Sequence, residues 1–351
     1  IMKYKFYTTS ENAWQAMRLA ILGAQDHIYL ESYILLEDPL TKNLFQALKD
    51  KARAGVKVKI IVDQVGSFWI SSSSLAEYAD AGIEILFYRR FFSRNHRKVL
   101  IIDGKTAFLG GVNIYGKYAK WLDLHLSISD KFFIGNLLKS FAKVYQLSGG
   151  ADSLAMDHLK KPEAGNRRIA LYKAKIFLIE HWPFRRESVL KRYYKNKISG
   201  SMRNIVIVTP YFVPHKWFVK AIDGAVRRGV SVEVFLPKKT DLLVADLANW
   251  VSAEELSGRI NFLFLPEMIH AKILLVDDKE GMVGSNNIDA RSFDLNLETG
   301  IIFQRSDMII SLKDILKKWR ESAVPYGEMP LWRPWYYGIV KSFIKLISPS
   351  L

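Results

Sequence analysis

The stretch His96-Arg97-Lys98-Val99-Leu100-Ile101-Ile102-Asp103 recurs later in the chain as His270-Ala271-Lys272-Ile273-Leu274-Leu275-Val276-Asp277. A second segment, Ala54-Gly55-Val56-Lys57-Val58, recurs as Arg228-Gly229-Val230-Ser231-Val232. The offset from Gly55 to Gly229 equals the offset from His96 to His270. Two separate matches at one offset indicate that a structural unit is duplicated.

Each copy has the pattern of a strand, a helix and a second strand. Strand-like runs at 27–35 and 204–212 are each followed by a helix that ends before the Gly-Val turn, and then by a buried type of apolar strand. Helical segments at 74–81 and 245–256 precede strands at 83–88 and 260–265. Asp103-Gly104 between apolar runs predicts a hairpin. We therefore predict an α/β protein with two similar α/β/α sandwich halves, each built on a mixed sheet.

The paired histidine and lysine of each copy lie on one face of the predicted strand, because residues two apart point the same way. An imidazole beside an ammonium suits a phosphoryl group: the imidazole can attack phosphorus or move a proton, and the ammonium can hold a nonbridging oxygen. Beyond each aspartate come Gly110-Gly111-Val112-Asn113 and Gly284-Ser285-Asn286-Asn287, at the same spacing in both copies. Small residues let the backbone approach a ligand closely, and an asparagine amide can donate to a phosphate oxygen.

The double pattern His-x-Lys-x4-Asp-x6-Gly-(Gly/Ser)-x-Asn resembles the signature of the phospholipase D superfamily. One copy is expected by chance on the order of once in 10⁵ chains of this length. The resemblance implies that the halves pack about a pseudo-twofold axis and bring both motifs into one cleft. One histidine would form a covalent phosphohistidine, and the other would protonate the leaving alcohol and then activate the incoming nucleophile. The resemblance favours His96 as the nucleophile and His270 as the acid and base, but the residues themselves leave the two roles interchangeable.

Two carboxylates are candidates to orient the imidazoles. Asp123 follows His96 in the first copy, and Glu298 follows His270 at nearly the same distance along the second copy. Both lie in apolar, strand-like surroundings, where an unpaired carboxylate would be costly. A carboxylate that accepts from the far ring nitrogen fixes the tautomer of an imidazole, so we predict that both are histidine partners. Pairing with an arginine or lysine alone is the alternative.

The candidate catalytic residues are thus His96, Lys98, Asp103, Asn113, Asp123, His270, Lys272, Asp277, Asn287 and Glu298. The candidate phosphate-binding residues are Lys98, Lys272, Asn113, Asn287, Ser285 and Gly111. By the resemblance, Asp103 and Asp277 are structural residues of turns and salt bridges. The remaining histidines, His27, His125, His158, His181 and His215, are expected to be core or surface residues. No cofactor or metal ion is required by this set, because two lysines and the donor amides can neutralise a phosphate.

Segments outside the motifs indicate the kind of phosphodiester. Residues 289–298 resemble the Arg-Ser-Phe-x-Leu-Asn-x-Glu segment of bacterial cardiolipin synthases, and residues 31–34, 63–67, 121–125 and 209–214 are similar to that family as well. The resemblance covers about residues 10–325. It implies that a phosphatidyl group moves from phosphatidylglycerol to a histidine and then to the hydroxyl of a second phospholipid. A phospholipase D hydrolase and a nuclease of the same superfamily are the alternatives, and a non-catalytic binding protein is disfavoured because both motifs are complete.

The composition favours an anionic partner. Lys+Arg 51 against Asp+Glu 35 gives a formal net charge of +16, which attracts polyanions and is the main argument for the nuclease alternative. The resemblance predicts an anionic phospholipid surface, no obligatory nucleic acid and no protein partner. No apolar run approaches the roughly 20 residues of a spanning helix. Together with this observation, the resemblance to bacterial cardiolipin synthases implies a peripheral protein at the cytoplasmic face of a bacterial inner membrane. The chain opens Ile1-Met2, and a membrane anchor before it stays an open alternative.

The expected domain organisation is a first half at 1–150, a basic linker or surface excursion at 151–200, a second half at 201–325 and an aromatic and basic tail at 326–351. The tail pattern predicts an interfacial amphipathic helix, with a C-terminal helix docked on the core as the alternative. Residues 132–138 are apolar enough to add surface near the cleft, but helix packing is favoured for them.

Overall fold

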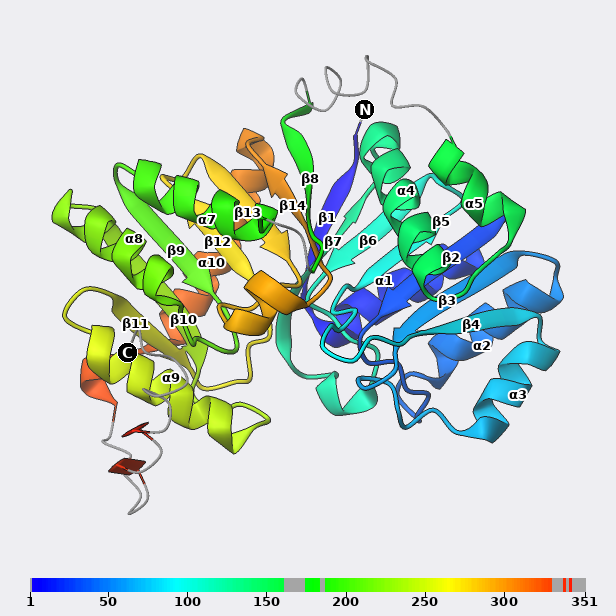
Figure 1. The fold of residues 1–351 in the computed structure, drawn as a ribbon, viewed down its shortest axis with the longest axis horizontal. Coiled ribbons are helices and arrows are strands. Elements are labelled where there is room, and N and C mark those ends of the chain that lie inside the picture. The colour runs from blue at the N-terminus through cyan, green and yellow to red at the C-terminus, as the bar shows by residue number, and fades with distance from the viewer. Residues whose placement is uncertain (1, 161–173, 184–186, 330–336, 339–340, 343–351) are drawn as a thin grey trace.

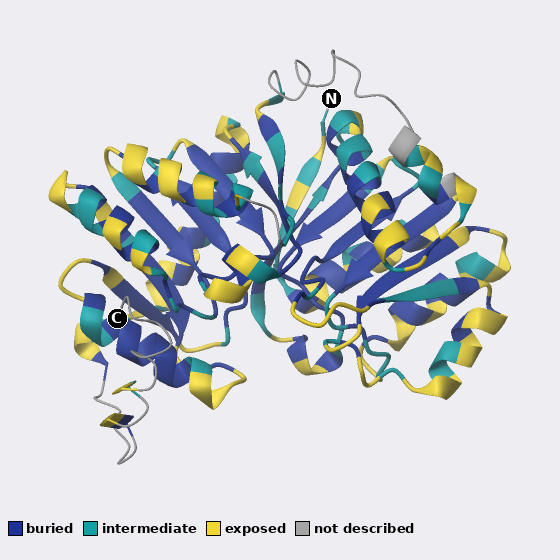
Figure 2. Cartoon of the chain, in the orientation of Figure 1, coloured by how far each residue is buried: buried dark blue, intermediate teal, exposed yellow. Residues whose placement is uncertain are grey.

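Two α/β halves lie side by side along the long axis of the molecule (Figure 1). The computed structural model describes residues 2–160, 174–183, 187–329, 337–338 and 341–342. The central strands and the inner faces of helices are buried, whereas the outer faces of helices and many loops are exposed (Figure 2).

The first half contains a seven-stranded mixed sheet in the order β1-β7-β6-β5-β2-β3-β4. Its strands are β1 (Tyr4–Thr9), β2 (His27–Ser32), β3 (Lys57–Asp63), β4 (Ile83–Tyr88), β5 (Val99–Ile102), β6 (Thr106–Gly110) and β7 (Leu122–Ile128). Strands β2, β3 and β4 are parallel, and the other neighbours are antiparallel. One face packs against α1 (Ser10–Leu22), α2 (Lys42–Arg53) and α3 (Ser72–Asp80), and the other against α4 (Lys131–Leu147) and α5 (Ser153–Lys160).

The second half contains an eight-stranded mixed sheet in the order β15-β11-β10-β9-β12-β13-β14-β8. Its strands are β8 (Ile176–His181), β9 (Asn204–Val208), β10 (Ser231–Pro237), β11 (Asn261–Leu265), β12 (Ile273–Val276), β13 (Glu280–Gly284), β14 (Glu298–Phe303) and β15 (Val324–Pro325). Helices α7 (Val189–Gly200), α8 (Lys216–Arg227) and α9 (Leu243–Leu256) cover one face, and α10 (Ser306–Ser322) covers the other. From β8 to β11 the strand order repeats that from β1 to β4, which confirms the predicted α/β fold of two similar halves with mixed sheets.

The apolar core continues from one half into the other. A single cluster of buried side chains includes Leu109 of β6, Val283 of β13 and Ile301 of β14, together with the inner faces of α4 and α10. Arg97, only 1% exposed, adds an ion pair between the halves: its guanidinium lies 3.5 Å from Glu31 of β2 and 3.5 Å from Glu180 of β8. The two halves therefore share apolar packing and a buried charge cluster.

The predicted hairpin at Asp103-Gly104 is present, the second half has a matching one, and each motif aspartate begins its turn. Asp103 and Asp277 have φ angles of 51° and 53°, in the left-handed region that such turns require. The Asp103 carboxylate accepts from the main-chain nitrogens of Gln25, Asp26 and His27, and that of Asp277 accepts from those of Met202, Arg203 and Asn204. The expected salt bridges are replaced by these amide contacts in the described residues, because each carboxylate meets the backbone just before β2 or β9.

The expected linker at 151–200 is wrong for the part that the structure describes. Helix α5 packs on the first half, whereas β8 pairs with β14 along its whole length and α7 covers the second sheet. The strand β8 was not predicted, because its apolar run is short and lies among basic residues. Its pairing with β14 at the edge of the sheet stabilises it. Arg167, Arg168, Arg185 and Arg186 of the basic stretch lie outside the described residues.

The described part of the C-terminal tail docks on the second half, as the alternative interpretation predicted. Tyr337 is buried and donates from its hydroxyl to Glu254 at 2.7 Å, and Lys341 pairs with Glu254 and Glu255 at 3.1 and 2.8 Å. The rest of the tail beyond residue 329 lies outside the described residues. Phe133 and Leu137 of the apolar segment 132–138 are fully buried, so helix packing explains them. Within the described residues, none of the helices combines enough length with enough apolar character to cross a bilayer.

We predict that Asp103→Ala lowers the free energy of unfolding by about 2 kcal/mol, because three main-chain donors lose a charged acceptor. Burial opposes ionisation of Asp103, but the amide contacts lower its pKa below the usual value. Its stabilising contribution is therefore present above the unfolded-state pKa of about 4 and is lost as the pH falls through the lower folded-state pKa. Urea denaturation at pH 7 and at acid pH measures both effects. Asp80→Ala, at an exposed position, is the control, and equal stability of the two variants would contradict the prediction.

Candidate active site

His96 and His270 line one cavity of about 400 Å³ at the junction of the two halves. The cavity lies at the carboxyl ends of the parallel strands β2, β3, β9 and β10, where α/β sheets commonly bind ligands. The lining residues are Tyr33, Ile34, Arg94, His96, Asn113, Tyr118, Trp121, Tyr211, Asp241, Leu242, His270, Asn287, Asp289, Arg291 and Asn296. The two motifs, far apart in the sequence, thus meet in one site.

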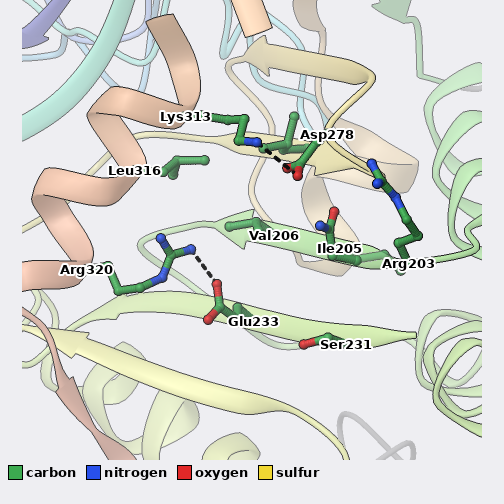
Figure 3. A pocket seen from close by; sticks show the side chains of 11 residues that line it. Arg203, Ile205, Val206, Ser231, Glu233, Asp278, Lys313, Leu316 and Arg320 are labelled. Carbon is green, nitrogen blue, oxygen red and sulfur yellow. Dashed lines mark hydrogen bonds and ion pairs between the residues drawn. The ribbon is translucent and has the colours of Figure 1, made fainter. Parts of the chain in front are cut away.

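A second cavity of similar volume lies at the opposite end of β9 and β10, beside α10 (Figure 3). Two of its three cations are held by neighbouring carboxylates: Lys313 pairs with Asp278 at 3.0 Å, and Arg320 pairs with Glu233 at 2.6 Å. No histidine lines this cavity. These ion pairs connect α10 to the sheet, whereas both motif histidines lie at the other end of the strands.

His96 is held by a carboxylate from the second half. Its Nδ1 lies 3.1 Å from both carboxylate oxygens of Glu298, the first residue of β14. The backbone is fixed as well, because the His96 nitrogen donates to the carbonyl of Leu297 at 3.0 Å. The preceding nitrogen, of Asn95, donates to Asp63 at the end of β3 at 2.8 Å. The ring therefore has a fixed orientation, with Nδ1 on the carboxylate.

His270 is held in the same way by a carboxylate from the first half. Its Nδ1 lies 3.0 Å from Oδ2 of Asp123 on β7, and its main-chain nitrogen donates to the carbonyl of Leu122 at 2.6 Å. Both carboxylates contact a histidine, as predicted, but each accepts a hydrogen bond from the histidine of the other half. The histidine and the carboxylate have nearly equal spacings in the two copies, and these spacings do not indicate that the hydrogen bonds connect one copy to the other.

The small residues after each motif pack against these carboxylates. A Cβ atom on Gly111 would lie 2.0 Å from Oδ1 of Asp123, so only glycine leaves room for that carboxylate. The corresponding Ser285 donates from its hydroxyl to Glu298. Contact with phosphate was predicted for both residues, but both are buried and neither lines the cavity. They position the histidine partners instead.

Lys98 and Lys272 lie beneath the histidines. Each lysine is 2% exposed, and its Nζ donates to the main-chain carbonyl oxygen of the histidine two residues earlier. For Lys98 the distance from Nζ to the His96 oxygen is 2.5 Å. Burial lowers the pKa of Lys98 to about 7 and that of Lys272 to about 8, although Glu298 and Asp123 oppose the shifts. Neither lysine lines the cavity, although contact with phosphate was predicted for both; an anion bound in the cavity would act on the buried ammonium groups through its charge and favour their charged forms.

Asn113 and Asn287 line the cavity itself, as the motif predicts. The Oδ1 of Asn113 accepts from the main-chain nitrogen of Ile34 at 3.3 Å, so the amide NH₂ of the same side chain is the group available to a ligand. The Asn287 main chain is fixed by the hydroxyl of Ser292, which accepts from it at 3.0 Å. Asparagine side chains from both halves thus line the cavity, and that of Asn287 also hydrogen-bonds to Asp289.

The electrostatics favour neutral imidazoles beside ionised carboxylates. Burial would raise the pKa of Glu298, but His96, Lys98 and the Ser285 hydroxyl lower it to about 2. Burial lowers the pKa of His96, and burial together with Lys272 lowers that of His270 to about 4. With a proton on Nδ1 donated to the carboxylate, each neutral ring keeps a lone pair on Nε2 for the cavity.

Several lining residues were not predicted as site residues, although their segments were noted for their resemblance to cardiolipin synthases. Tyr33 packs edge-on to the His96 ring at 5.0 Å, and Trp121 packs against the His270 ring at 5.5 Å. Arg94 and Arg291 add positive charge to the wall. These residues precede or follow the motifs at irregular distances, so the repeat itself did not identify them. The other five histidines do not line the cavity.

Comparisons with known proteins agree with this architecture. The family model "Cardiolipin synthase, PLD-like domain" matches residues 17–145 and 194–319. A cardiolipin synthase of Geobacillus kaustophilus is 30% identical over 98% of this chain and 71% of that protein, and one of Halalkalibacterium halodurans is 27% identical over 99% and 72%. The fold is also similar to a phosphatidylserine synthase from Haemophilus influenzae, with a TM-score of 0.74 at 15% identity, over 99% of this chain and 95% of that one.

The paired sheets and the two-histidine cavity define a phospholipase D-like protein. Within that superfamily, the chain belongs to the cardiolipin synthase family.

We predict that the two neighbours of His270 shift its pKa in opposite directions. Asp123→Asn should lower the pKa below about 4, because the negative charge that favours the imidazolium is lost, and Lys272→Met should raise it. Nitrogen NMR of the histidine rings measures both values, with the His215 resonance as a control for intact folding. Shifts of the same sign in the two variants would contradict the assigned geometry.

Proposed function

We propose that this protein is a phosphatidyltransferase that forms cardiolipin from phosphatidylglycerol and the hydroxyl of a second phospholipid. The observation that carries this proposal is the pair of imidazoles, one from each half, that line a single cavity with their Nδ1 atoms on carboxylates. Family membership supports the lipid substrate.

In the proposed first step, Nε2 of His96 attacks the phosphorus of phosphatidylglycerol. The bond from phosphorus to the glycerol headgroup oxygen breaks, and His270 in its imidazolium form gives its proton to that oxygen, so glycerol leaves. The entering phosphate anion favours the imidazolium, and Asp123 stabilises it at Nδ1. Glu298 stabilises the positive charge that His96 acquires when it carries the phosphatidyl group.

In the second step, neutral His270 removes the proton from a lipid hydroxyl, whose oxygen attacks the phosphohistidine and releases His96. Asn113 and Asn287, which line the cavity, are assigned to the phosphoryl oxygens, and the buried Lys98 and Lys272 are assigned the positive charge that favours the phosphate anion. The two-oxygen contact of Glu298 with His96 supports His96 as the nucleophile, because a phosphorylated imidazole that keeps its Nδ1 proton is positively charged. If water takes the place of the lipid hydroxyl, the same steps give phospholipase D hydrolysis.

The proposal places the protein at the cytoplasmic face of a bacterial inner membrane as a peripheral protein. An anionic phospholipid surface is its partner, with no obligatory nucleic acid, protein partner, cofactor or metal ion. The formal charge of +16 supports attraction to such a surface. Residues 1–150 and 201–325 act as one catalytic unit in this account, which the exchange of carboxylates between the halves supports.

We predict that purified protein converts phosphatidylglycerol vesicles into cardiolipin and glycerol. His96→Ala and His270→Ala should each reduce turnover by at least about 10³-fold, because each removes a group that transfers a proton or forms the intermediate. Lys313→Ala, in the cavity of Figure 3, should leave turnover unchanged. Chromatography of the lipids and an assay of free glycerol measure the products.

The covalent intermediate is sought by mass spectrometry in the His270→Ala variant, where the peptide that contains His96 should gain a phosphatidyl group. Trapping on His270 in the His96→Ala variant would reverse the roles. Plasmid nicking by the same preparation, without lipid turnover, would contradict the proposed function and support a nuclease.

A further inference from the structure

Exposed apolar side chains gather on three loops that leave the carboxyl ends of β3, β4 and β10. We define these segments, 64–71, 89–94 and 238–244, as the cavity rim. The third includes the first two residues of α9. The rim side chains with more than half of their surface exposed, between 55% and 86%, are Phe68, Trp69, Phe91, Phe92, Leu242, Leu243 and Val244.

The rim is fixed to the mouth of the two-histidine cavity. Arg94 and Leu242 belong to the cavity wall. The carboxylate of Asp63 joins two of the loops: Oδ1 accepts from the main-chain nitrogens of Val65 and Gly66 at 2.9 and 3.0 Å, and Oδ2 accepts from that of Asn95 at 2.8 Å. Both halves therefore contribute apolar tips beside the opening.

The rim aromatics pack on one another while they stay exposed. The Phe68 and Trp69 rings lie 4.0 Å apart, and the Phe91 and Phe92 rings lie 4.7 Å apart. Their exposed fractions of 61% to 86% show that the core does not cover them. Several exposed apolar side chains in loops beside a cavity indicate a binding surface, whereas apolar side chains scattered singly over a surface do not.

Basic side chains accompany the apolar tips. Arg89 and Arg90 precede Phe91, and Lys238 and Lys239 precede Leu242 in the same loop; all four are exposed. None of them forms an ion pair with a carboxylate of the described residues. The one acidic residue of the rim, Asp241, accepts a hydrogen bond from Tyr211 at 2.6 Å. Aromatic and aliphatic tips bordered by cations match the boundary between acyl chains and anionic headgroups.

We propose that the cavity rim inserts into an anionic phospholipid bilayer, with its apolar side chains below the headgroups and its basic side chains at the phosphates. This inference rests on the proposed function, because it explains how a phosphodiester reaches the histidines without its lipid leaving the bilayer. A fluid bilayer can accommodate apolar side chains from separate loops of the two halves. The aliphatic residues 242–244 distinguish this surface from one that binds nucleic acid through phosphate contacts alone.

The first experiment places a reporter on the rim. The chain contains no cysteine, so one introduced thiol carries the only label. Phe92→Cys and Leu243→Cys, each labelled with an environment-sensitive NBD fluorophore, should shift to shorter wavelength on phosphatidylglycerol vesicles and be quenched by lipids with nitroxide-labelled acyl chains. Met202→Cys, 74% exposed just before β9 and thus at the other end of the sheet, should show neither effect.

The second experiment separates membrane binding from chemistry. The double variant Phe91→Ser with Phe92→Ser should lower partitioning into phosphatidylglycerol vesicles by at least about 10-fold, measured by flotation. The matched control, Met202→Ser with Ile310→Ser, removes two exposed apolar side chains elsewhere and should bind as the unchanged protein does. On monomeric short-chain phosphatidylglycerol, the rim variant should keep the turnover of the unchanged protein.

The outcomes distinguish the two proposals. Unchanged vesicle binding by the rim variant, or no response from the rim labels, would overturn the inference, as would loss of plasmid binding while vesicle binding is kept. If the labels respond and the rim variant loses vesicle binding, the membrane surface stands even where neither form of phosphatidylglycerol is turned over. In that case only the proposed function fails.

Discussion

Two imidazole–carboxylate hydrogen bonds cross the junction between the halves, and the site depends on them. Asp123 of the first half holds His270, and Glu298 of the second half holds His96. All four groups are buried, where an unpartnered carboxylate or a freely rotating imidazole would be unfavourable. Neither half contains a complete histidine–carboxylate pair, so both pairs form only when the two copies pack together. The shared core between β6, β13 and β14 brings the pairs into register.

The two pairs differ although the folds around them match. The shorter carboxylate of Asp123 packs on Gly111, whereas the longer Glu298 extends to both His96 and Ser285. The residue at this place in each copy therefore fits its carboxylate: glycine leaves room for Asp123, and serine donates a hydrogen bond to Glu298. This difference gives the pseudo-symmetric site two chemically distinct ends.

The sequence predicted the architecture because the repeat is long and its strands are buried and apolar. The strand 83–88 was predicted at its observed bounds, and both motif hairpins are present. The expected strand 27–35 ends earlier, at Ser32, because the chain then leaves the sheet to bring Tyr33 to the cavity. The edge strand β8 was missed, since its stability comes from pairing with β14 rather than from its own composition.

The sequence indicated which residues belong to the candidate site, but it did not indicate which histidine contacts which carboxylate. Motif spacing indicated the histidines, lysines, asparagines and carboxylates, yet no spacing within one copy reports a contact made across two copies. The same limit applies to Gly111 and Ser285, whose small size was attributed to a ligand and is explained by a carboxylate. The apolar rim was missed because its residues are short runs in separate loops, which only the parallel strands bring to one end of the sheets.

The central claim is that both imidazoles act on one phosphorus atom. A crystal structure of the protein with orthovanadate, which adopts the geometry of a phosphoryl group in transfer, tests it most directly. We expect the vanadium bonded to Nε2 of one of the two histidines, a vanadate oxygen in hydrogen-bond contact with Nε2 of the other, and both Nδ1 atoms still on Asp123 and Glu298. Vanadate bound to only one imidazole with the other out of reach, or bound instead in the cavity beside α10, would contradict the account.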